Sequence, residues 1–410
     1  MVFDMLKYIF TGFSPNTTFH DVSLAFGLLL RPWQWRTGPA VKRIETWFCE
    51  YFSVPHAIAF DSGRTALEYS LRALNVGKGD EVLVQAFTCV VVINAIRFVG
   101  ATPVYVDIQS DYTMNPHDAE KKITEKTRCM IIQHTFGQSA DLELLLNIAK
   151  NKSLSIIEDC AHALGGMYHN KLLGTFGDVA MFSFGSDKVI SGVRGGLAIT
   201  QNNDVGAALR SYQNILPKTN RWKIVQHLLH PIWFYCGRAT YHLGIGKFAL
   251  FLSKFFALAN RILYPPEKEG DRVPWYPSQL SNALASLAFE QLPYLDDWNK
   301  ERMNHARYYA ENLLDKKNII AFGSENTWLR FPVEIFERDQ VMKRSKSFGI
   351  ILGDWYTTVV APADSNLKKA LYESGTCPRA EMVCQRIINL PTDPYLRKED
   401  LDRVIASLCI

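Results

Sequence analysis

Three kinds of reactive side chain follow one another along this chain in an order that suits a single cofactor. A polar turn, Ser62 to Thr65, comes first, the pair Glu158-Asp159 follows, and Lys188 stands twenty-nine residues after Asp159. A lysine amine can hold an aldehyde cofactor as a Schiff base, a carboxylate can keep a pyridine nitrogen protonated, and small donors can bind a phosphate. The order of these groups therefore predicts pyridoxal phosphate.

The polar turn joins a predicted strand to a predicted helix. A helix N-terminus offers unpaired backbone amides and a positive dipole end, which suit a phosphate. Gly63 lets the backbone approach closely, Thr65 adds a hydroxyl, and Arg64 could add charge. A simple helix cap is the alternative, and the turn taken alone does not exclude it.

The acidic pair and the lysine each follow a short apolar run. Glu158 and Asp159 close a buried strand, so one of them must face inward, and Asp159 could pair with a pyridinium nitrogen. The alternative is an ordinary pair facing a loop. Ser183 places a hydroxyl near another strand end, and Lys188 follows one short loop later. Apolar and glycine-rich flanks make a solvated surface position less expected for Lys188.

Alternating strands and helices must position these groups. Short β-branched runs predict buried strands at Ala57–Phe60, Glu81–Val84, Thr102–Val106, Cys129–Ile132, Ser155–Ile157 and Val179–Phe182. Helices are predicted between them at Ala66–Leu74, Val91–Phe98, Asp118–Ile123 and Leu142–Asn151. This alternation indicates an α/β fold with a large, mostly parallel sheet covered on both faces. Ligands of such sheets bind beyond the carboxyl ends of the strands, where Asp107, His134, Asp159 and Ser183 would share one rim.

A second, smaller α/β unit is expected towards the C-terminus. A new alternation begins at Phe331 to Ile335 and ends in a predicted helix, Lys398–Leu408. A chain of 410 residues is long enough for two lobes. We therefore expect an N-terminal extension over 1–35, a large cofactor-binding domain over 36–290 and a small domain over 291–410.

Composition and missing motifs narrow the class of protein. Apolar residues make up 48%, charged residues 21%, and the net charge is +4, so nucleic-acid binding is not expected. The eight cysteines are scattered without a CxxC pair, which indicates a reduced, cytoplasmic protein. No secretion signal, spanning run or hydrolase GxSxG elbow is evident. His227 and His230 lack a third ligand nearby, so no metal site is predicted.

An aromatic and cationic segment interrupts the large domain at about 217–273. Within it, Lys247, Lys254 and Arg261 recur every seven residues among apolar side chains, which on one helix over 244–264 would form a cationic stripe beside a broad apolar surface. Such a helix can lie in a membrane interface, so we expect a membrane contact through 228–264 as one possibility. The alternative is packing on its own domain or on a second subunit.

The motifs occur in the order typical of one family. The chain carries Thr37-Gly38-Pro39 with Glu45, Ser62–Leu67, Gln85–Thr88, Val106–Ile108, His134–Gly137, Glu158–Gly165, Gly177-Asp178, Phe182–Phe184, Cys377–Glu381 and Leu390–Thr392. In these features it resembles the DegT/DnrJ/EryC1/StrS sugar aminotransferases, a branch of the fold type I pyridoxal phosphate enzymes. The resemblance implies the cytoplasmic transfer of an amino group from glutamate to a nucleotide-linked keto sugar, in cell-surface glycan or secondary-metabolite biosynthesis.

The resemblance also implies roles for individual residues. Lys188 would hold the cofactor and carry a proton, and Asp159 would bind its pyridine nitrogen. Phe87 would stack on the ring, and His162 stands where the family commonly has a glutamine near the phenolic oxygen. The phosphate would be held by Gly63, Arg64, Thr65 and Ser183. Family members commonly form homodimers.

Departures from the family pattern leave other functions open. Arg194 stands where the family has an acid, and Pro277-Ser278-Gln279 replaces an Asn-x-Arg pattern. One alternative is an aminotransferase peripheral to the inner face of the cell membrane, acting on a lipid-linked or amphiphilic ketone. Another is a non-catalytic sensor or scaffold with this fold. Lys188 and Asp159 argue against the second alternative.

Overall fold

A seven-stranded sheet forms the centre of the fold in the computed structural model, which describes residues 8–12, 16–255, 258–313, 323 and 325–408. Its strands, in spatial order, are β2 (His56–Phe60), β11 (Gly196–Thr200), β10 (Val179–Ser183), β7 (Ser155–Asp159), β6 (Thr127–Gln133), β3 (Glu81–Gln85) and β5 (Thr102–Val106). Strand β11 runs antiparallel to both of its neighbours, and the other adjacent pairs are parallel. The predicted mostly parallel sheet is confirmed.

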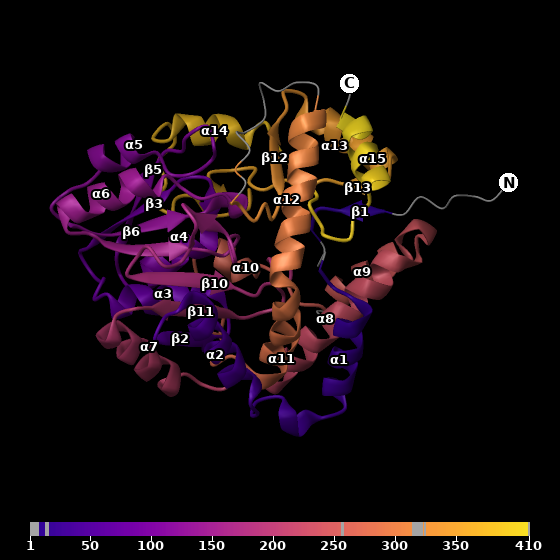
Figure 1. Ribbon diagram of the computed structural model, residues 1–410, viewed down its shortest axis with the longest axis horizontal. Coiled ribbons are helices and arrows are strands. Elements are labelled where there is room, and N and C mark those ends of the chain that lie inside the picture. The colour runs from indigo at the N-terminus through magenta and orange to yellow at the C-terminus, as the bar shows by residue number, and fades with distance from the viewer. Residues whose placement is uncertain (1–7, 13–15, 256–257, 314–322, 324, 409–410) are drawn as a thin grey trace.

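Helices cover both faces of this sheet (Figure 1). One face packs against α3 (Gly63–Ala73), α4 (Val90–Phe98) and α7 (Asn203–Ile215). The other packs against α2 (Ala40–Phe52), α5 (Pro116–Lys121), α6 (Leu142–Lys152) and α11 (Asn282–Gln291). Successive strand residues alternate between the two cores, as Ile131 and Ile132 do. This alternation explains why the strands read as continuous apolar runs.

The predicted strands of the sheet all occur, and most of the predicted helices lie within a few residues of their expected bounds. The helix expected at Asp118–Ile123 instead begins at Pro116. The Asn115 side chain accepts hydrogen bonds from the backbone N–H groups of His117 and Asp118, so it caps the helix earlier than the apolar pattern indicated.

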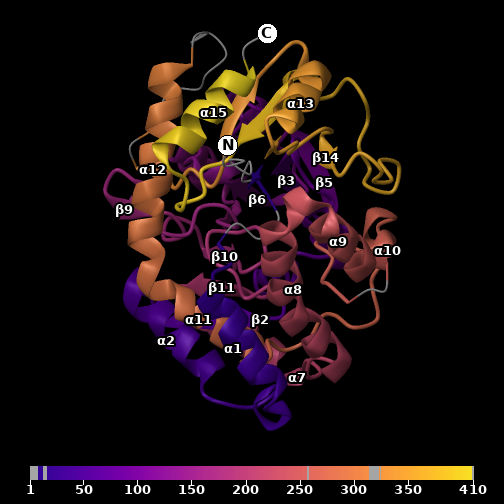
Figure 2. The same cartoon turned by 90° about the vertical axis from the view of Figure 1, so that its right-hand side faces the viewer.

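Most of the C-terminal elements, which lie above the sheet in Figure 2, enclose a core of their own. They are α12 (Leu295–Asn312), β12 (Phe331–Glu334), α13 (Arg338–Ser347), β13 (Ile350–Ile351), β15 (Ile387–Leu390) and α15 (Lys398–Leu408). The other two elements, β14 (Val360–Ala361) and α14 (Pro378–Cys384), pack into the core between the sheet and α3 and α4. Strand β1 (Ile9–Phe10) pairs with β13, so part of the predicted N-terminal extension joins this lobe. The domain boundaries near residues 35 and 290 stay predictions.

Short elements complete the large lobe. They are η1 (Pro32–Gln34), β4 (Thr88–Cys89), η2 (Thr135–Gly137), β8 (Met167–Tyr168), β9 (Lys171–Leu172) and η4 (Leu292–Tyr294). Strand β4 pairs with β14 of the C-terminal part, which brings residues near 355–361 towards the rim of the sheet.

The aromatic and cationic segment forms a helical hairpin beside α1 (Phe19–Leu29) in Figures 1 and 2. Its elements are α8 (Arg221–Ala239), η3 (Tyr241–Leu243), α9 (Ile245–Phe255) and α10 (Pro265–Lys268). The prediction of one helix over 244–264 is wrong beyond Phe255. The backbone N–H groups of Leu258 and Ala259 both bond to the Ser253 carbonyl, so the chain turns back and Arg261 does not extend a stripe from Lys247. Across the described residues, no helix combines the length and apolar character needed to span a membrane.

Candidate cofactor site

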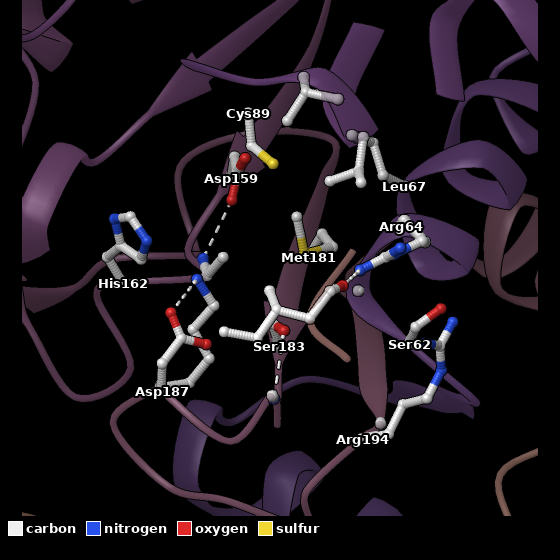
Figure 3. Close-up of a pocket in the computed structure, with 18 of the residues that line it drawn as sticks. Ser62, Arg64, Leu67, Cys89, Asp159, His162, Met181, Ser183, Asp187 and Arg194 are labelled. Carbon is white, nitrogen blue, oxygen red and sulfur yellow. Dashed lines mark hydrogen bonds and ion pairs between the residues drawn. The ribbon is translucent and has the colours of Figure 1, made fainter. Parts of the chain in front are cut away.

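A cavity of about 110 Å³ opens at the carboxyl edge of the sheet (Figure 3). Because β7 and β10 are parallel neighbours, Asp159 and Ser183 reach this edge side by side. The turn before α3 and the loop after β10 close the cavity. Of the predicted site residues, the structure brings six to its lining, and these are Gly63, Arg64, Asp159, His162, Ser183 and Lys188.

Lys188 lies in a tightly held loop. Its backbone N–H donates to the Gly185 carbonyl at 3.1 Å. The Asn16 amide donates to the carbonyls of Lys188 and Val189 at 2.8 and 2.7 Å, so the N-terminal segment also fixes the loop. The Lys188 amine is mostly buried, with its Nζ 3.8 Å from Oδ2 of Asp187. The amine therefore points into the cavity from a backbone with little freedom.

Asp187 links the lysine to the C-terminal lobe. Its Oδ2 accepts a hydrogen bond from Arg330 Nη2 at 2.8 Å. Burial alone would raise the pKa of Asp187, but the charges of Lys188 and Arg330 hold that pKa well below its usual value. The Arg330 guanidinium lies 3.6 Å from the centre of the Trp355 ring. Sequence reasoning missed this ion pair, for which the adjacency of Asp187 to Lys188 was the only signal.

Asp159 is a buried carboxylate with room for a further donor. Its Oδ1 accepts from the Ala161 N–H at 3.0 Å. Burial raises the pKa of Asp159, while the Ala161 hydrogen bond and the Lys188 charge oppose the rise. A carboxylate has about four acceptor positions, so it can also receive a protonated ring nitrogen. Asp159 therefore has the free acceptor capacity that its predicted contact with a pyridinium nitrogen requires.

His162 is held as a neutral imidazole with a defined tautomer. Burial lowers the pKa of His162 well below 6.5, and the charges of Lys188 and Arg330 lower it further. Its Nδ1 accepts from the Phe136 N–H at 3.2 Å, so we assign the ring proton to Nε2. A neutral ring with this tautomer can donate from Nε2 to a ligand oxygen in the cavity.

The N-terminus of α3 reaches the cavity through a close packing contact. A Cβ at position 63 would lie 3.0 Å from both Met181 Sδ and Ser183 Cβ, so any larger residue would require these neighbours to shift by a few tenths of an ångström. Ser183 also lines the cavity, and its Oγ accepts from the Gly185 N–H at 3.4 Å. Backbone amides at a helix start together with this hydroxyl suit an anionic group such as a phosphate.

Arg64 and Thr65 have other partners. The Arg64 guanidinium forms an ion pair with Glu267 of α10 and donates to the Ile262 carbonyl at 2.8 Å. The Thr65 hydroxyl donates to Asp61 at 2.6 Å, and Thr65 does not line the cavity. Phosphate binding by these two residues stays a prediction, and their protein contacts compete with it.

Phe87 lies behind the cavity wall. Its side chain is fully buried and its ring centre lies 5.3 Å from that of Tyr356. A positive φ of 69° at Phe87 turns the chain just before β4. Cys89 and Tyr356 line the cavity, and the structure does not bring the predicted stacking residue, Phe87, to it.

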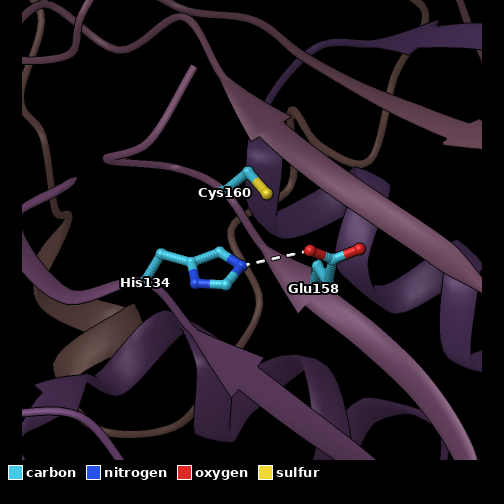
Figure 4. Close-up of side chains that lie close together, drawn as sticks. All are labelled: His134, Glu158 and Cys160. Atoms are coloured by element: carbon cyan, nitrogen blue, oxygen red, sulfur yellow. Dashed lines mark hydrogen bonds and ion pairs between the residues drawn. The ribbon is translucent and has the colours of Figure 1, made fainter. Parts of the chain in front are cut away.

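A buried group of His134, Glu158 and Cys160 has donor atoms close enough for a metal ion (Figure 4). The ring nitrogens of His134 and the carboxylate oxygens of Glu158 already take part in hydrogen bonds. Glu158 accepts from His134 Nε2 at 3.2 Å and from the N–H groups of Gly174, Phe176 and Gly177. His134 Nδ1 accepts from the Ala140 N–H at 3.2 Å, and burial raises the pKa of Cys160, which keeps it a thiol. The group therefore supports the strand ends, and it lies outside the cavity.

Comparison with known proteins relates most of the chain to aminotransferases. The model of the DegT/DnrJ/EryC1/StrS aminotransferase family matches residues 25–244 and 259–409, with an interruption where α9 lies. A UDP-N-acetyl-3-dehydro-alpha-D-glucosamine 3-aminotransferase from Acidithiobacillus ferrooxidans is 28% identical over 94% of this chain and 92% of its own. A GDP-perosamine synthase from Escherichia coli O157:H7 is 36% identical over 48% of this chain and 54% of its own.

Solved structures share the fold. DesV from S. venezuelae, solved with a ketimine intermediate, superposes with a TM-score of 0.73 at 25% identity, covering 95% of this chain and 93% of its own. Structures of similar proteins at 21% and 23% identity, solved with pyridoxamine phosphate or in a pyridoxal phosphate form, show the fold alone.

Proposed function

The chain belongs to the DegT/DnrJ/EryC1/StrS aminotransferase family, and from this premise we propose that it moves an amino group from glutamate to a nucleotide-linked keto sugar with pyridoxal phosphate as cofactor. The observation that carries the proposal is the convergence of Lys188, Asp159 and His162 on one cavity. Family membership and these retained groups favour an enzyme over the non-catalytic sensor that the sequence left open.

Each side chain of the cavity has a task in such a reaction. Bound pyridoxal phosphate supplies an electron sink for bond cleavage next to the amino nitrogen. Asp159 would keep the pyridine nitrogen protonated, and His162 would donate from Nε2 to the phenolic oxygen. Lys188 Nζ would hold the aldehyde group of the cofactor and would carry a proton at the substrate carbon. Ser183 and the N-terminus of α3 would receive the phosphate.

Arg330 supports an amino donor that carries a carboxylate. The side chain is only 1% exposed, and among the described residues its Nε and Nη1 have no hydrogen-bond partner. It lines a hollow at the cavity mouth together with Lys188, Trp355 and Tyr356. A guanidinium with free N–H groups binds a carboxylate in a fork-like geometry, which fits one end of glutamate.

The relatives support the assignment of the acceptor. One acts by its name on a UDP-linked dehydrosugar, and the other is named for a GDP-linked amino sugar. Because their nucleotides differ, the proposal extends to a nucleotide-linked keto sugar and leaves the base open. The product class is an amino sugar.

Isotope transfer tests this function. The holoenzyme is incubated with glutamate labelled with heavy nitrogen and with UDP- or GDP-linked 3-keto or 4-keto sugars, and the sugars are examined by mass spectrometry. We expect the label in the sugar for wild type and none for Lys188→Ala. Formation of 2-oxoglutarate without labelled sugar from any acceptor of this set would refute the acceptor class and keep the donor.

An amphiphilic acceptor at a membrane surface is a second candidate, favoured by α9. Phe248, Phe251 and Phe255 are 63%, 59% and 68% exposed on this helix. Ile262, which follows α9 in the chain, is also exposed and lines the cavity mouth. A helix of this kind can insert its aromatic face among lipid chains and present a lipid-linked ketone to the cavity.

A second apolar surface fits a homodimer contact. Phe26 and Leu30 at the end of α1 are exposed, and so is Trp33 in the adjacent η1. We propose that this surface pairs with a second copy and that α9 meets the membrane. Large exposed aromatics are typical of both kinds of contact, so the two surfaces need separate tests.

Matched variants separate the two contacts. Phe248→Ser with Phe251→Ser should abolish sedimentation with vesicles of phosphatidylglycerol and phosphatidylethanolamine while the protein stays dimeric by light scattering. Phe26→Ser with Trp33→Ser should give monomers that still sediment. Wild-type protein that ignores the vesicles would refute the membrane candidate, and a wild-type monomer would refute the dimer.

A further inference from the structure

Arg194 is a buried cation with unused hydrogen-bonding capacity. It lies in the segment that leads into β11, is 7% exposed and lines the cavity. Its guanidinium carbon lies 4.6 Å from the centre of the Tyr276 ring. Among the described residues its Nη2 has no hydrogen-bond partner. A buried N–H donor without an acceptor is unfavourable, so Nη2 of Arg194 is suited to an acceptor atom that a ligand supplies.

The neighbouring carboxylates do not provide that acceptor. Asp61 accepts from the hydroxyls of Ser62 and Thr65 on one oxygen and from the N–H and hydroxyl of Ser278 on the other. The charge of Arg194 favours the ionised form of Asp61, but no hydrogen bond joins the two. Glu267 is paired with Arg64. Arg194 therefore keeps a free N–H group for a ligand.

The ring geometry of pyridoxal phosphate indicates which part of it would meet Arg194. Its phenolic oxygen and its phosphate arm flank the aldehyde carbon, opposite the ring nitrogen. With the nitrogen at Asp159 and the aldehyde at Lys188, these two groups point to opposite sides. Figure 3 shows His162 on one side of the cavity and Ser62 and Arg194 on the other, with Asp159 between them in that view. His162 takes the side of the phenolic oxygen, so Arg194 lies on the side of the phosphate.

We propose that Arg194 binds the phosphate of pyridoxal phosphate from within the same chain, beside the amides of the α3 N-terminus and the hydroxyls of Ser62 and Ser183. This inference rests on the proposed function for the identity of the cofactor. Arg64, which the sequence favoured for this task, is neutralised by Glu267, whereas Arg194 forms no ion pair among the described residues and keeps an N–H of Nη2 free for the anion.

Comparing two cofactor forms tests the proposal without measuring activity. Dissociation constants of apoprotein for pyridoxal phosphate and for pyridoxal, which lacks the phosphate, are measured by absorbance titration in wild type and Arg194→Gln. The variant should bind pyridoxal phosphate about 10- to 100-fold more weakly, as expected for loss of a hydrogen bond to a charged group, with pyridoxal affinity unchanged. Lys223→Gln is the matched control, because Lys223 lies with Arg194 beside a neighbouring cavity and does not line this one. It should leave both constants unchanged.

Each other result has a defined meaning. Equal weakening of both forms would show that Arg194 only shapes the cavity, and no weakening would show that the phosphate lies elsewhere; either overturns the inference. Unchanged pyridoxal phosphate affinity with weaker UDP binding to the holoenzyme would assign Arg194 to the acceptor and also overturn it. If Arg194→Gln does not fold, the same two dissociation constants are measured for Arg194→Lys. The proposal then requires this variant to prefer pyridoxal phosphate over pyridoxal by a smaller factor than wild type does. Wild type that binds neither form would refute the proposed function instead.

Discussion

Replacing His162 with glutamine tests whether this side chain is a neutral donor in the cavity. Glutamine can accept the Phe136 N–H through its carbonyl and donate into the cavity through its amide, so it keeps both hydrogen bonds without a titratable ring. We therefore expect the His162→Gln variant to keep pyridoxal phosphate affinity within about threefold of wild type, since no charge-assisted contact is lost. Its dependence of stability on pH should change instead.

The size of that change follows from proton linkage. Burial holds the pKa of His162 well below 6.5 in the folded protein, whereas the unfolded chain titrates near 6.5. Below that pH the unfolded state binds one more proton than the folded state, so the contribution is fully present above pH 6.5 and is lost as the pH falls. The loss is about 1.4 kcal/mol at pH 5.5 and about 2 kcal/mol at pH 5.0. The His162→Gln variant should not lose this free energy, because glutamine has no titratable ring.

Urea unfolding of the apoprotein between about pH 7 and pH 5 measures the difference. His162→Gln should lose less free energy of unfolding than wild type by the amounts above, and His20→Gln at an exposed position should follow wild type. His227 is also buried with a lowered pKa, so it contributes equally to both proteins and cancels. Parallel curves for wild type and His162→Gln would refute the neutral imidazole.

Three further substitutions have defined outcomes. Asp159→Asn should weaken pyridoxal phosphate binding by about tenfold or more, since a charge-assisted hydrogen bond is lost, and yet stabilise the apoprotein in thermal unfolding at neutral pH. The stability should rise because burial raises the pKa of the Asp159 carboxyl in the folded state, so the ionised carboxylate destabilises the fold above that pKa. An Asp159→Asn apoprotein that is less stable than wild type would contradict this reasoning. Glu267→Gln should lower the free energy of unfolding by about 3 kcal/mol, because it leaves Arg64 without its counter-ion, and the added change Arg64→Met should recover part of the loss in the same urea experiment. Gly63→Ala should push α3 away from Met181 and raise the dissociation constant for pyridoxal phosphate, and unchanged binding would show that the helix start is not part of the phosphate site.

The sequence was sufficient for the parts of the site that follow from strand order. Asp159 and Ser183 each end a short apolar strand, and parallel neighbours must present such residues at one edge, so their meeting could be predicted. Lys188 could be placed for the same reason, because a short loop after β10 leaves it little reach. The short β-branched apolar runs and their alternation with helices were enough to predict the sheet itself.

Contacts between residues that are far apart in the sequence could not be predicted from strand order. Arg64 pairs with Glu267, 203 residues further along the chain, and Arg330 reaches Asp187 from another lobe. No local pattern encodes these pairings. Backbone conformation was the other obstacle, since no local pattern predicted the positive φ of 69° at Phe87, whose side chain is buried outside the cavity lining.

The helix expected over 244–264 failed for a related reason. Apolar residues continue past Phe255, so the period persists, but the carbonyl of Ser253 captures two N–H groups and ends the helix. Ala259 is then buried against the hairpin. Tertiary packing, which periodicity does not report, decides where such a segment stops.

The residue to which the cofactor becomes attached tests the central claim most directly. Holoenzyme is reduced with borohydride, digested, and mapped by tandem mass spectrometry, with and without prior addition of L-glutamate. A pyridoxyl group on Lys188 that disappears after glutamate treatment is the predicted result, because the donor converts the cofactor to its amine form and frees the lysine. A label on another lysine, or a label on Lys188 that glutamate does not remove, would contradict an aminotransferase built around this cavity.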